Sequence, residues 1–287
     1  METNAKNSLH VRCNSLPSEP HPLVSQFKEQ LQRLKDSEAS TTSSSSFSII
    51  HRLNGFQDLH DCADKLLQLP TIRQDLALAC SKKCIDGLLD GSLKILDICG
   101  SAQDCLLQSK ENLYEIQSAL RRKGGETGFA IEVGKYMASR KNMKKVIQKA
   151  LGNLKGMKVE SSKDEEALLV FSILKESEAI TVRSLESLLL FISEPKGQSK
   201  HSRWSKLSKL MQPARVTCDS QETEANEFVN VDAALQSVIS QKHLNAENIR
   251  SQMENLEICI QDLEVRVEQL SRQLIRTRVS LLNILSH

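Results

Sequence analysis

The sequence has few aromatic residues and few prolines. Seven Phe, two Tyr and one Trp make up 3% of the 287 residues, and the six prolines leave residues 71–194 and 214–287 without any. Many-stranded β architectures depend on aromatic and β-branched side chains and on turn residues at short intervals. This composition therefore excludes them and predicts an all-α protein.

The sequence also lacks a long apolar run. No stretch approaches the roughly twenty apolar residues that cross a bilayer, and the first thirty residues contain no signal-peptide core. Glu2 excludes N-myristoylation. We therefore expect a cytoplasmic protein that could at most lie on a membrane surface. The eight cysteines are expected to be reduced in that compartment and mostly buried.

Motifs for catalysis or for metal binding are missing as well. The glycines of residues 124–128 have no preceding strand and no following lysine, so they indicate a turn rather than a phosphate-binding loop. Cys80 and Cys84 are four residues apart, whereas structural zinc sites use two closely spaced pairs of ligands. We predict no enzyme activity, no cofactor and no metal site.

Apolar residues recur at helical spacing through most of the chain, and the prolines and glycines divide this pattern. We predict helix ends at Pro70, at Gly100 and at the pair Gly124-Gly125. The pattern indicates an elongated helical bundle in four segments. These are a disordered tail over 1–22, the bundle over 23–195, a basic flexible linker over 196–226, and one long C-terminal helix over 227–287 that packs on the bundle.

The C-terminal segment has a seven-residue repeat. With Ile239 at position a and Lys242 at position d, twelve of the fourteen a and d residues up to Ile284 are apolar. Such a coiled-coil pattern requires packing against at least one other helix. The partner could be a second copy, which would form a homodimer through 239–284, or the bundle itself. The e and g residues do not pair systematically, and this favours packing within the chain.

One helical segment is strongly basic. Residues 135–158 contain eight Lys and Arg and no acidic residue, although the net charge of the chain is only +2. Such a segment could be the solvated surface of a bundle helix, could lie on an anionic membrane, or could bind an acidic protein in a calmodulin-type groove. Nucleic acid is disfavoured because no stacking aromatic residues accompany the lysines. The candidate anion-binding residues are Lys135, Arg140, Lys141, Lys144, Lys145 and Lys149.

Two short motifs indicate regulation or docking. Arg12 precedes Ser15 by three residues and Pro17 follows it by two, which is the spacing of a phosphoserine site read by an arginine cluster. Ser15 is therefore a candidate phosphorylation site. The only tryptophan, Trp204, lies in a basic, hydroxyl-rich stretch and could either bind a partner or pack back on the bundle.

Four blocks of sequence resemble a plant family. They are residues 22–27 (Pro-Leu-Val-Ser-Gln-Phe), 54–62 (Asn-Gly-Phe-Gln-Asp-Leu-His-Asp-Cys), 88–93 (Leu-Leu-Asp-Gly-Ser-Leu), and 136–141 (Tyr-Met-Ala-Ser-Arg-Lys) leading into 149–155. They are similar to the BYPASS-like family, also described as domain of unknown function 241. The resemblance implies a plant-specific helical protein connected with root and shoot development and root-to-shoot signalling. That family has no assigned active site, so no residue role is carried over.

Together these features predict a non-enzymatic interaction protein in plant development. Its expected partner is an acidic or helical protein, or an anionic membrane surface. The alternative is a small-molecule carrier or enzyme with a pocket inside the bundle, and this would require polar groups that converge on an apolar cavity.

Overall fold

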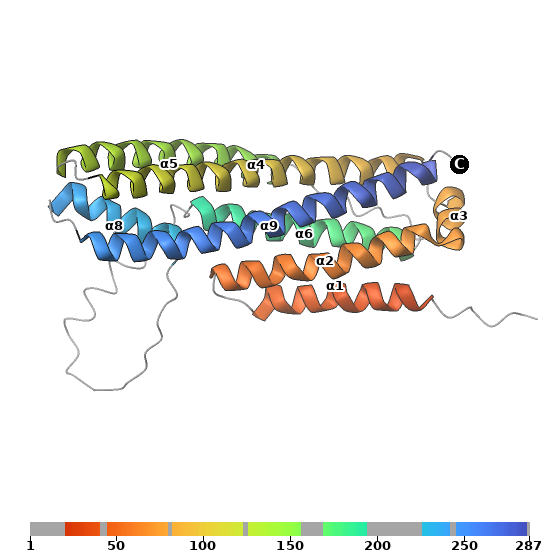
Figure 1. Cartoon of the computed structure of the whole chain (residues 1–287). Coiled ribbons are helices and arrows are strands. Elements are labelled where there is room, and N and C mark those ends of the chain that lie inside the picture. Colours follow the sequence, from red (N-terminus) through yellow and green to blue (C-terminus); the bar gives the residue numbers. More distant parts are fainter. Residues whose placement is uncertain are drawn as a thin grey trace, which may run out of the picture.

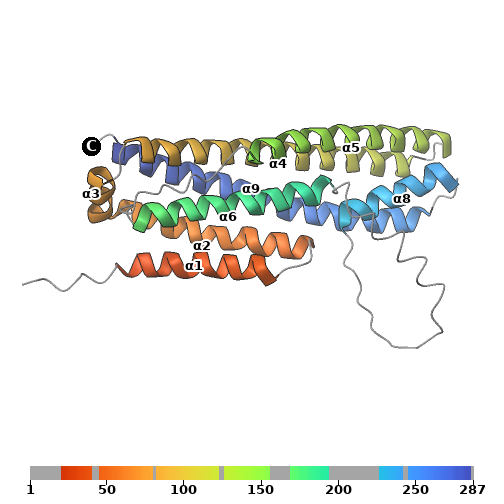
Figure 2. The same ribbon diagram turned by 180° about the vertical axis from the view of Figure 1, so that it is seen from behind.

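The computed structural model describes residues 21–40, 45–79, 82–122, 126–155, 169–193, 226–241 and 245–285. Within them it contains eight helices and no strand, which confirms the all-α bundle (Figures 1 and 2). The helices are α1 (Pro22–Ser40), α2 (Ser46–Gln68), α3 (Pro70–Ala79), α4 (Lys82–Arg121), α5 (Glu126–Lys155), α6 (Leu169–Ser193), α8 (Glu227–Gln241) and α9 (Ala246–Leu285).

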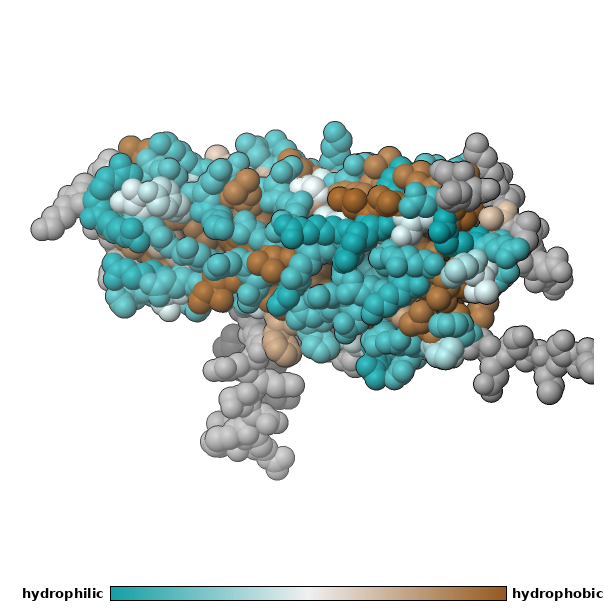
Figure 3. Space-filling model, turned by 45° about the vertical axis from the view of Figure 1, so that its right-hand side comes forward, coloured by the Kyte–Doolittle hydropathy of each residue, from teal (hydrophilic) through white to brown (hydrophobic). Residues whose placement is uncertain are grey.

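The two longest helices in the described part of the chain, α4 and α9, lie against each other. The helices α4 and α9 have forty residues each, which corresponds to about 60 Å of helix. They run antiparallel, and side-chain contacts from Lys110 to Glu264 and from Gln117 to Glu257 join them. The helix α5 lies along part of α4, α2 lies along α9, and α1 is the outermost helix beside α2 (Figure 1). The surface seen in Figure 3 is mostly hydrophilic, with hydrophobic residues in small separate groups.

The predicted helix ends are partly correct. Pro70 does separate two helices: α2 ends at Gln68, and proline is the first residue of α3, where its missing N–H leaves no bond unmade. The break predicted at Gly100 is wrong, because α4 continues through it. A Cβ at Gly100 would meet nothing within 4 Å, so this glycine costs only its helix propensity, roughly 1 kcal/mol.

The helix predicted over 227–287 is divided into α8 and α9. Asn245 caps the N-terminus of α9, since its Oδ1 accepts a hydrogen bond of 3.1 Å from the N–H of Asn248. From Ile249 to Ile284 the apolar a and d residues are buried, and α9 contacts α2, α4 and α8. The heptad face is therefore used within the chain.

Several sequence motifs lie outside the described residues. These are the phosphorylation motif of Arg12, Ser15 and Pro17, the stretch around Trp204, and nearly all of the predicted tail and linker. They remain predictions.

Candidate interaction surface on α5

The apolar side of the basic helix α5 faces the interior of the bundle. Its buried residues lie against α4, α6 and α8, and they include Val133, Tyr136, Met143 and Ile147. A helix that inserts into a bilayer, or that fills a calmodulin-type groove, needs this side free. In the folded bundle α5 can therefore offer a partner only its polar side.

Arg140 is not on that polar side. Its exposed fraction is 2%, and its guanidinium makes a two-pronged ion pair with Asp232 of α8, with Nε 3.0 Å from Oδ1 and Nη2 3.1 Å from Oδ2. Such bidentate pairs combine charge with fixed geometry. The candidate residue Arg140 is therefore not part of the surface that α5 exposes.

Further contacts enclose this ion pair. Nη1 of Arg140 donates to the carbonyl of Ile192 at the end of α6 (2.9 Å), and the guanidinium carbon lies 5.0 Å from the ring centre of Phe228. The hydroxyl of Tyr136 donates to Asp232 over 2.8 Å. Burial, and then the charge of Asp232, raise the pKa of Tyr136 well above its usual value. We call Arg140, Asp232 and Tyr136 the clasp, because they join α5, α6 and α8.

Lys144 lies at the edge of the clasp. Its side chain is 30% exposed, and its Nζ is 3.8 Å from Oδ2 of Asp232. Lys135 is well exposed but is paired with Glu132 on its own helix, at 3.0 Å. Both residues therefore have a partner within the chain.

The remaining three candidates form a row on the outer side of α5. Lys141, Lys145 and Lys149 are spaced four residues apart and are exposed, and none of them makes an ion pair with another described residue. A Cβ added at Gly134 or Gly152 of this helix would meet nothing within 4 Å. The row, which we call the outer lysines, therefore lies on an open surface.

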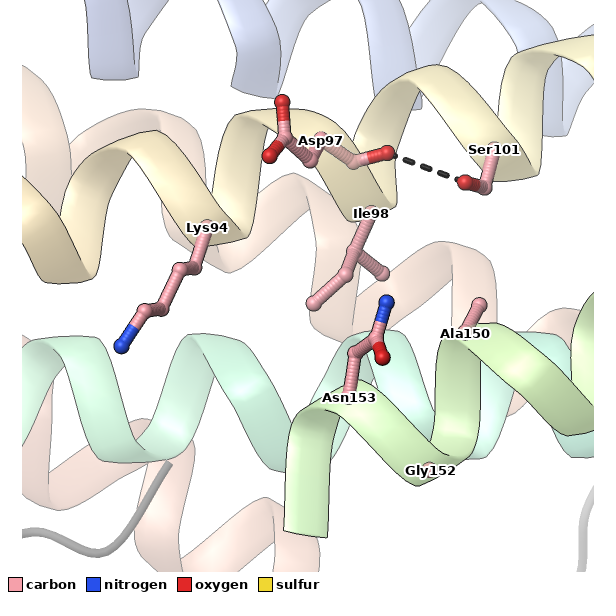
Figure 4. Close-up of a pocket in the computed structure, with 7 residues that line it drawn as sticks. All are labelled: Lys94, Asp97, Ile98, Ser101, Ala150, Gly152 and Asn153. Carbon is pink, nitrogen blue, oxygen red and sulfur yellow. Dashed lines mark hydrogen bonds between the residues drawn. The ribbon is translucent and has the colours of Figure 1, made fainter. Parts of the chain in front are cut away.

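One hollow near this surface is a groove at the C-terminal end of α5. It measures about 440 Å³ and lies between α4 and α5. Its charged side chains diverge: Lys94 and Asp97 point in different directions, and the Ser101 hydroxyl donates to the carbonyl of Asp97 within α4 (Figure 4). No polar groups converge as a catalytic or carrier site requires. The groove therefore does not favour the carrier or enzyme alternative.

The residues considered for zinc do not come together in the described part of the chain. Cys80 lies outside it, Cys84 is half-buried and is not in a disulfide, and no group of three His, Cys, Asp or Glu within the described residues could hold a metal. His60 is buried, and burial lowers its pKa to about 4. It is a neutral core residue at physiological pH.

The sequence analysis did not predict that Asp232 is the partner of Arg140. The spacing of the apolar residues around Asp232 does indicate that it faces the core. Asp232 lies among Phe228, Val231 and Leu235, so it occupies a core-facing position of α8. Arg140 similarly continues the buried series of α5. A single charge at such a position, in each of two helices, indicates a buried pair.

The fold and this surface define an all-helical protein with charged outer faces, in which no described helix is long and apolar enough to cross a membrane. The chain belongs to the family described as Protein BPS1, whose family model matches residues 52–284. This confirms the resemblance to the BYPASS-like family. No curated protein and no solved structure matches the chain. The matched residues do not include α1. Membership of the family indicates a role in plant development.

Proposed function

We propose that this protein serves plant development as a non-enzymatic binding protein, and that its outer lysines attach it to the anionic headgroups of a membrane. The observation that carries the proposal is the row Lys141, Lys145 and Lys149, which is exposed and makes no ion pair with the described residues. Within α5 no acidic residue follows Glu132, so the row is not neutralised along its own helix.

The attraction would be purely Coulombic. Each lysine near an anionic membrane contributes about 1 kcal/mol, so three give at most roughly 3 kcal/mol. Exposed acidic residues of the neighbouring helix α4 oppose this attraction, so the attachment is weak and reversible. The three residues span about 12 Å of straight helix, which suits a flat surface. Salt screens exposed charges over about 10 Å at 0.1 M, so the attachment should weaken as salt is added.

A matched pair of double variants tests the proposal. Lys141→Glu with Lys145→Glu changes the net charge by the same amount as Lys28→Glu with Lys65→Glu, which alters exposed lysines of α1 and α2. Binding is measured by co-sedimentation with vesicles of phosphatidylserine and phosphatidylcholine, and with vesicles of phosphatidylcholine alone. Circular dichroism verifies that both variants are folded.

We expect the wild-type protein to bind only the anionic vesicles. The α5 variant should lose at least about tenfold in affinity, and the control should stay close to wild type. Equal losses in both variants would show that net charge, rather than this surface, causes the binding. Absence of binding by the folded wild-type protein would also contradict the proposal.

A further inference from the structure

The helix α4 carries a row of acidic residues beside the outer lysines of α5. Asp97, Asp104 and Glu111 are seven residues apart, Glu115 follows one turn later, and all four are exposed. None of them makes an ion pair with another described residue. We call these four residues the acidic row. The outer face of α4 and α5 therefore presents opposite charges side by side.

The acids and the lysines lie at matching heights along the bundle. The helices α4 and α5 are neighbours and run antiparallel (Figures 1 and 2). Asn112 donates to the hydroxyl of Ser139 over 2.9 Å, and Ser109 contacts the sulfur of Met143 at 3.5 Å.

These two contacts fix the relative heights. They place Glu111 level with Lys141, and Asp104 between the levels of Lys145 and Lys149. Glu111 thus has a lysine at its own height on the neighbouring helix, and Asp104 lies between the heights of two lysines. All of these side chains are on exposed positions.

Exposed apolar side chains accompany the charges. Leu107 and Tyr114 of α4 are 52% and 67% exposed, and Ile131 and Val146 of α5 are 58% and 51% exposed. Leu107 and Tyr114 are seven residues apart, which is the repeat of helices that pack against other helices. The face thus has apolar contact area as well as charge.

We propose that two copies of the chain associate through this face, related by a twofold axis parallel to α4 and α5. Such an axis keeps every residue at its height and exchanges the two sides of the face. The acidic row of each copy then faces the outer lysines of the other copy, at matching heights. A twofold arrangement of this kind is closed, so it yields a dimer and no filament.

The size of the face suits a dimer. Residues 97–121 of α4 lie beside 131–155 of α5, a length of about 37 Å, and two helices are about 20 Å wide. The product is roughly 750 Å² per copy, close to the approximately 800 Å² of a standard interface. The dimer would cover the outer lysines, so it and the membrane-bound form exclude one another.

A charge-swap experiment tests this inference. One variant carries Asp104→Lys with Glu111→Lys, and the other carries Lys141→Glu with Lys145→Glu. Molar mass is measured by sedimentation equilibrium at about 100 µM protein, a concentration that detects weak dimers. We expect a wild-type dimer at about 50 mM salt and a monomer at about 500 mM, because the pairs are screened. Each variant alone should be monomeric, and an equimolar mixture should form the dimer again.

Three results would overturn the inference: a monomeric wild-type protein at low salt, a dimer that both variants retain, or a mixture of folded variants that stays monomeric. Membrane binding is evaluated separately. The acidic-row variant keeps all its lysines, so it should bind anionic vesicles at least as tightly as wild type even though it does not dimerise. Failure of the dimer is thus distinguishable from failure of the proposed membrane attachment.

Discussion

Arg140 and Lys141 are adjacent cations on one helix, and the structure uses them in different ways. Arg140 is 2% exposed and is held by Asp232, whereas Lys141 is exposed and makes no ion pair with a described residue. One residue corresponds to a rotation of about 100° around a helix, which is enough to move a side chain from the interior to the solvent. Counting charges along a segment therefore overstates a binding surface unless the core-facing positions are first removed.

The largest expected difference between interior and outer charges is in stability. Arg140→Ala should lower the free energy of unfolding by about 3–5 kcal/mol, because it leaves the Asp232 carboxylate, which is only 16% exposed, without its main partner. Lys141→Ala should change it by less than about 0.5 kcal/mol. Urea unfolding of both variants measures this. A cost below about 1 kcal/mol for Arg140→Ala would show that the clasp does not hold the bundle together.

A second interior charge should make stability depend on pH. Glu178 of α6 is paired with Lys175 at 3.0 Å, and its side chain is 15% exposed. Burial raises its pKa from 4.5 to about 7, although Lys175 acts in the opposite direction. The folded state therefore holds this proton more tightly than the unfolded state. The resulting stability is complete below about pH 4.5 and is lost as the pH rises through 7.

Glu178→Gln should remove this contribution, which we expect to be about 1–3 kcal/mol. Urea unfolding at pH 5 and pH 8 compares the variant with wild type. His60, whose pKa is also shifted, is present in both proteins, so its contribution is the same in each. The wild-type protein should lose more stability than the variant between these two values. Parallel pH profiles would mean that Glu178 is already charged in the folded protein at pH 5.

Lys144 lies at the boundary between interior and surface, whereas the adjacent Lys145 is exposed. Lys144→Glu places a second carboxylate near Asp232 and should cost about 1 kcal/mol of stability, whereas Lys145→Glu should cost less than about 0.5 kcal/mol. Anionic-vesicle affinity should show the reverse order, with the greater loss for Lys145→Glu. Identical behaviour of the two variants in both assays would remove the distinction between clasp and outer lysines.

Two glycines of α4 differ in the space beside them, and we expect small effects on stability from substituting them. Gly100→Ala should raise stability by about 0.5–1 kcal/mol, because the site is open and alanine is the better helix former. Gly91→Ala should lose that gain, since its Cβ would lie 2.8 Å from the paired carboxylate of Glu178. Thermal unfolding of the two single variants measures the difference. An equal gain at both positions would show that the Lys175–Glu178 pair moves aside freely.

Local features of this protein could be predicted from its sequence, and features that depend on distant residues could not. The apolar spacing of α5 and the proline at the start of α3 act within one helix, and they indicated these elements correctly. The burial of Arg140 depends on Asp232, which is 92 residues away in the chain, and on a carbonyl of α6. Gly100 gave a false helix end, because a glycine on an open helical face is tolerated when tertiary packing holds the helix on its other side.

The most direct test of the outer lysines as a binding surface is the salt dependence of vesicle binding. The affinity of the wild-type protein and of the Lys141→Glu, Lys145→Glu variant for phosphatidylserine vesicles is measured between about 50 and 300 mM salt. We predict a steep fall for the wild-type protein and a weak, nearly flat dependence for the variant. Wild-type binding that is insensitive to salt, or the same curve for both proteins, would contradict the account.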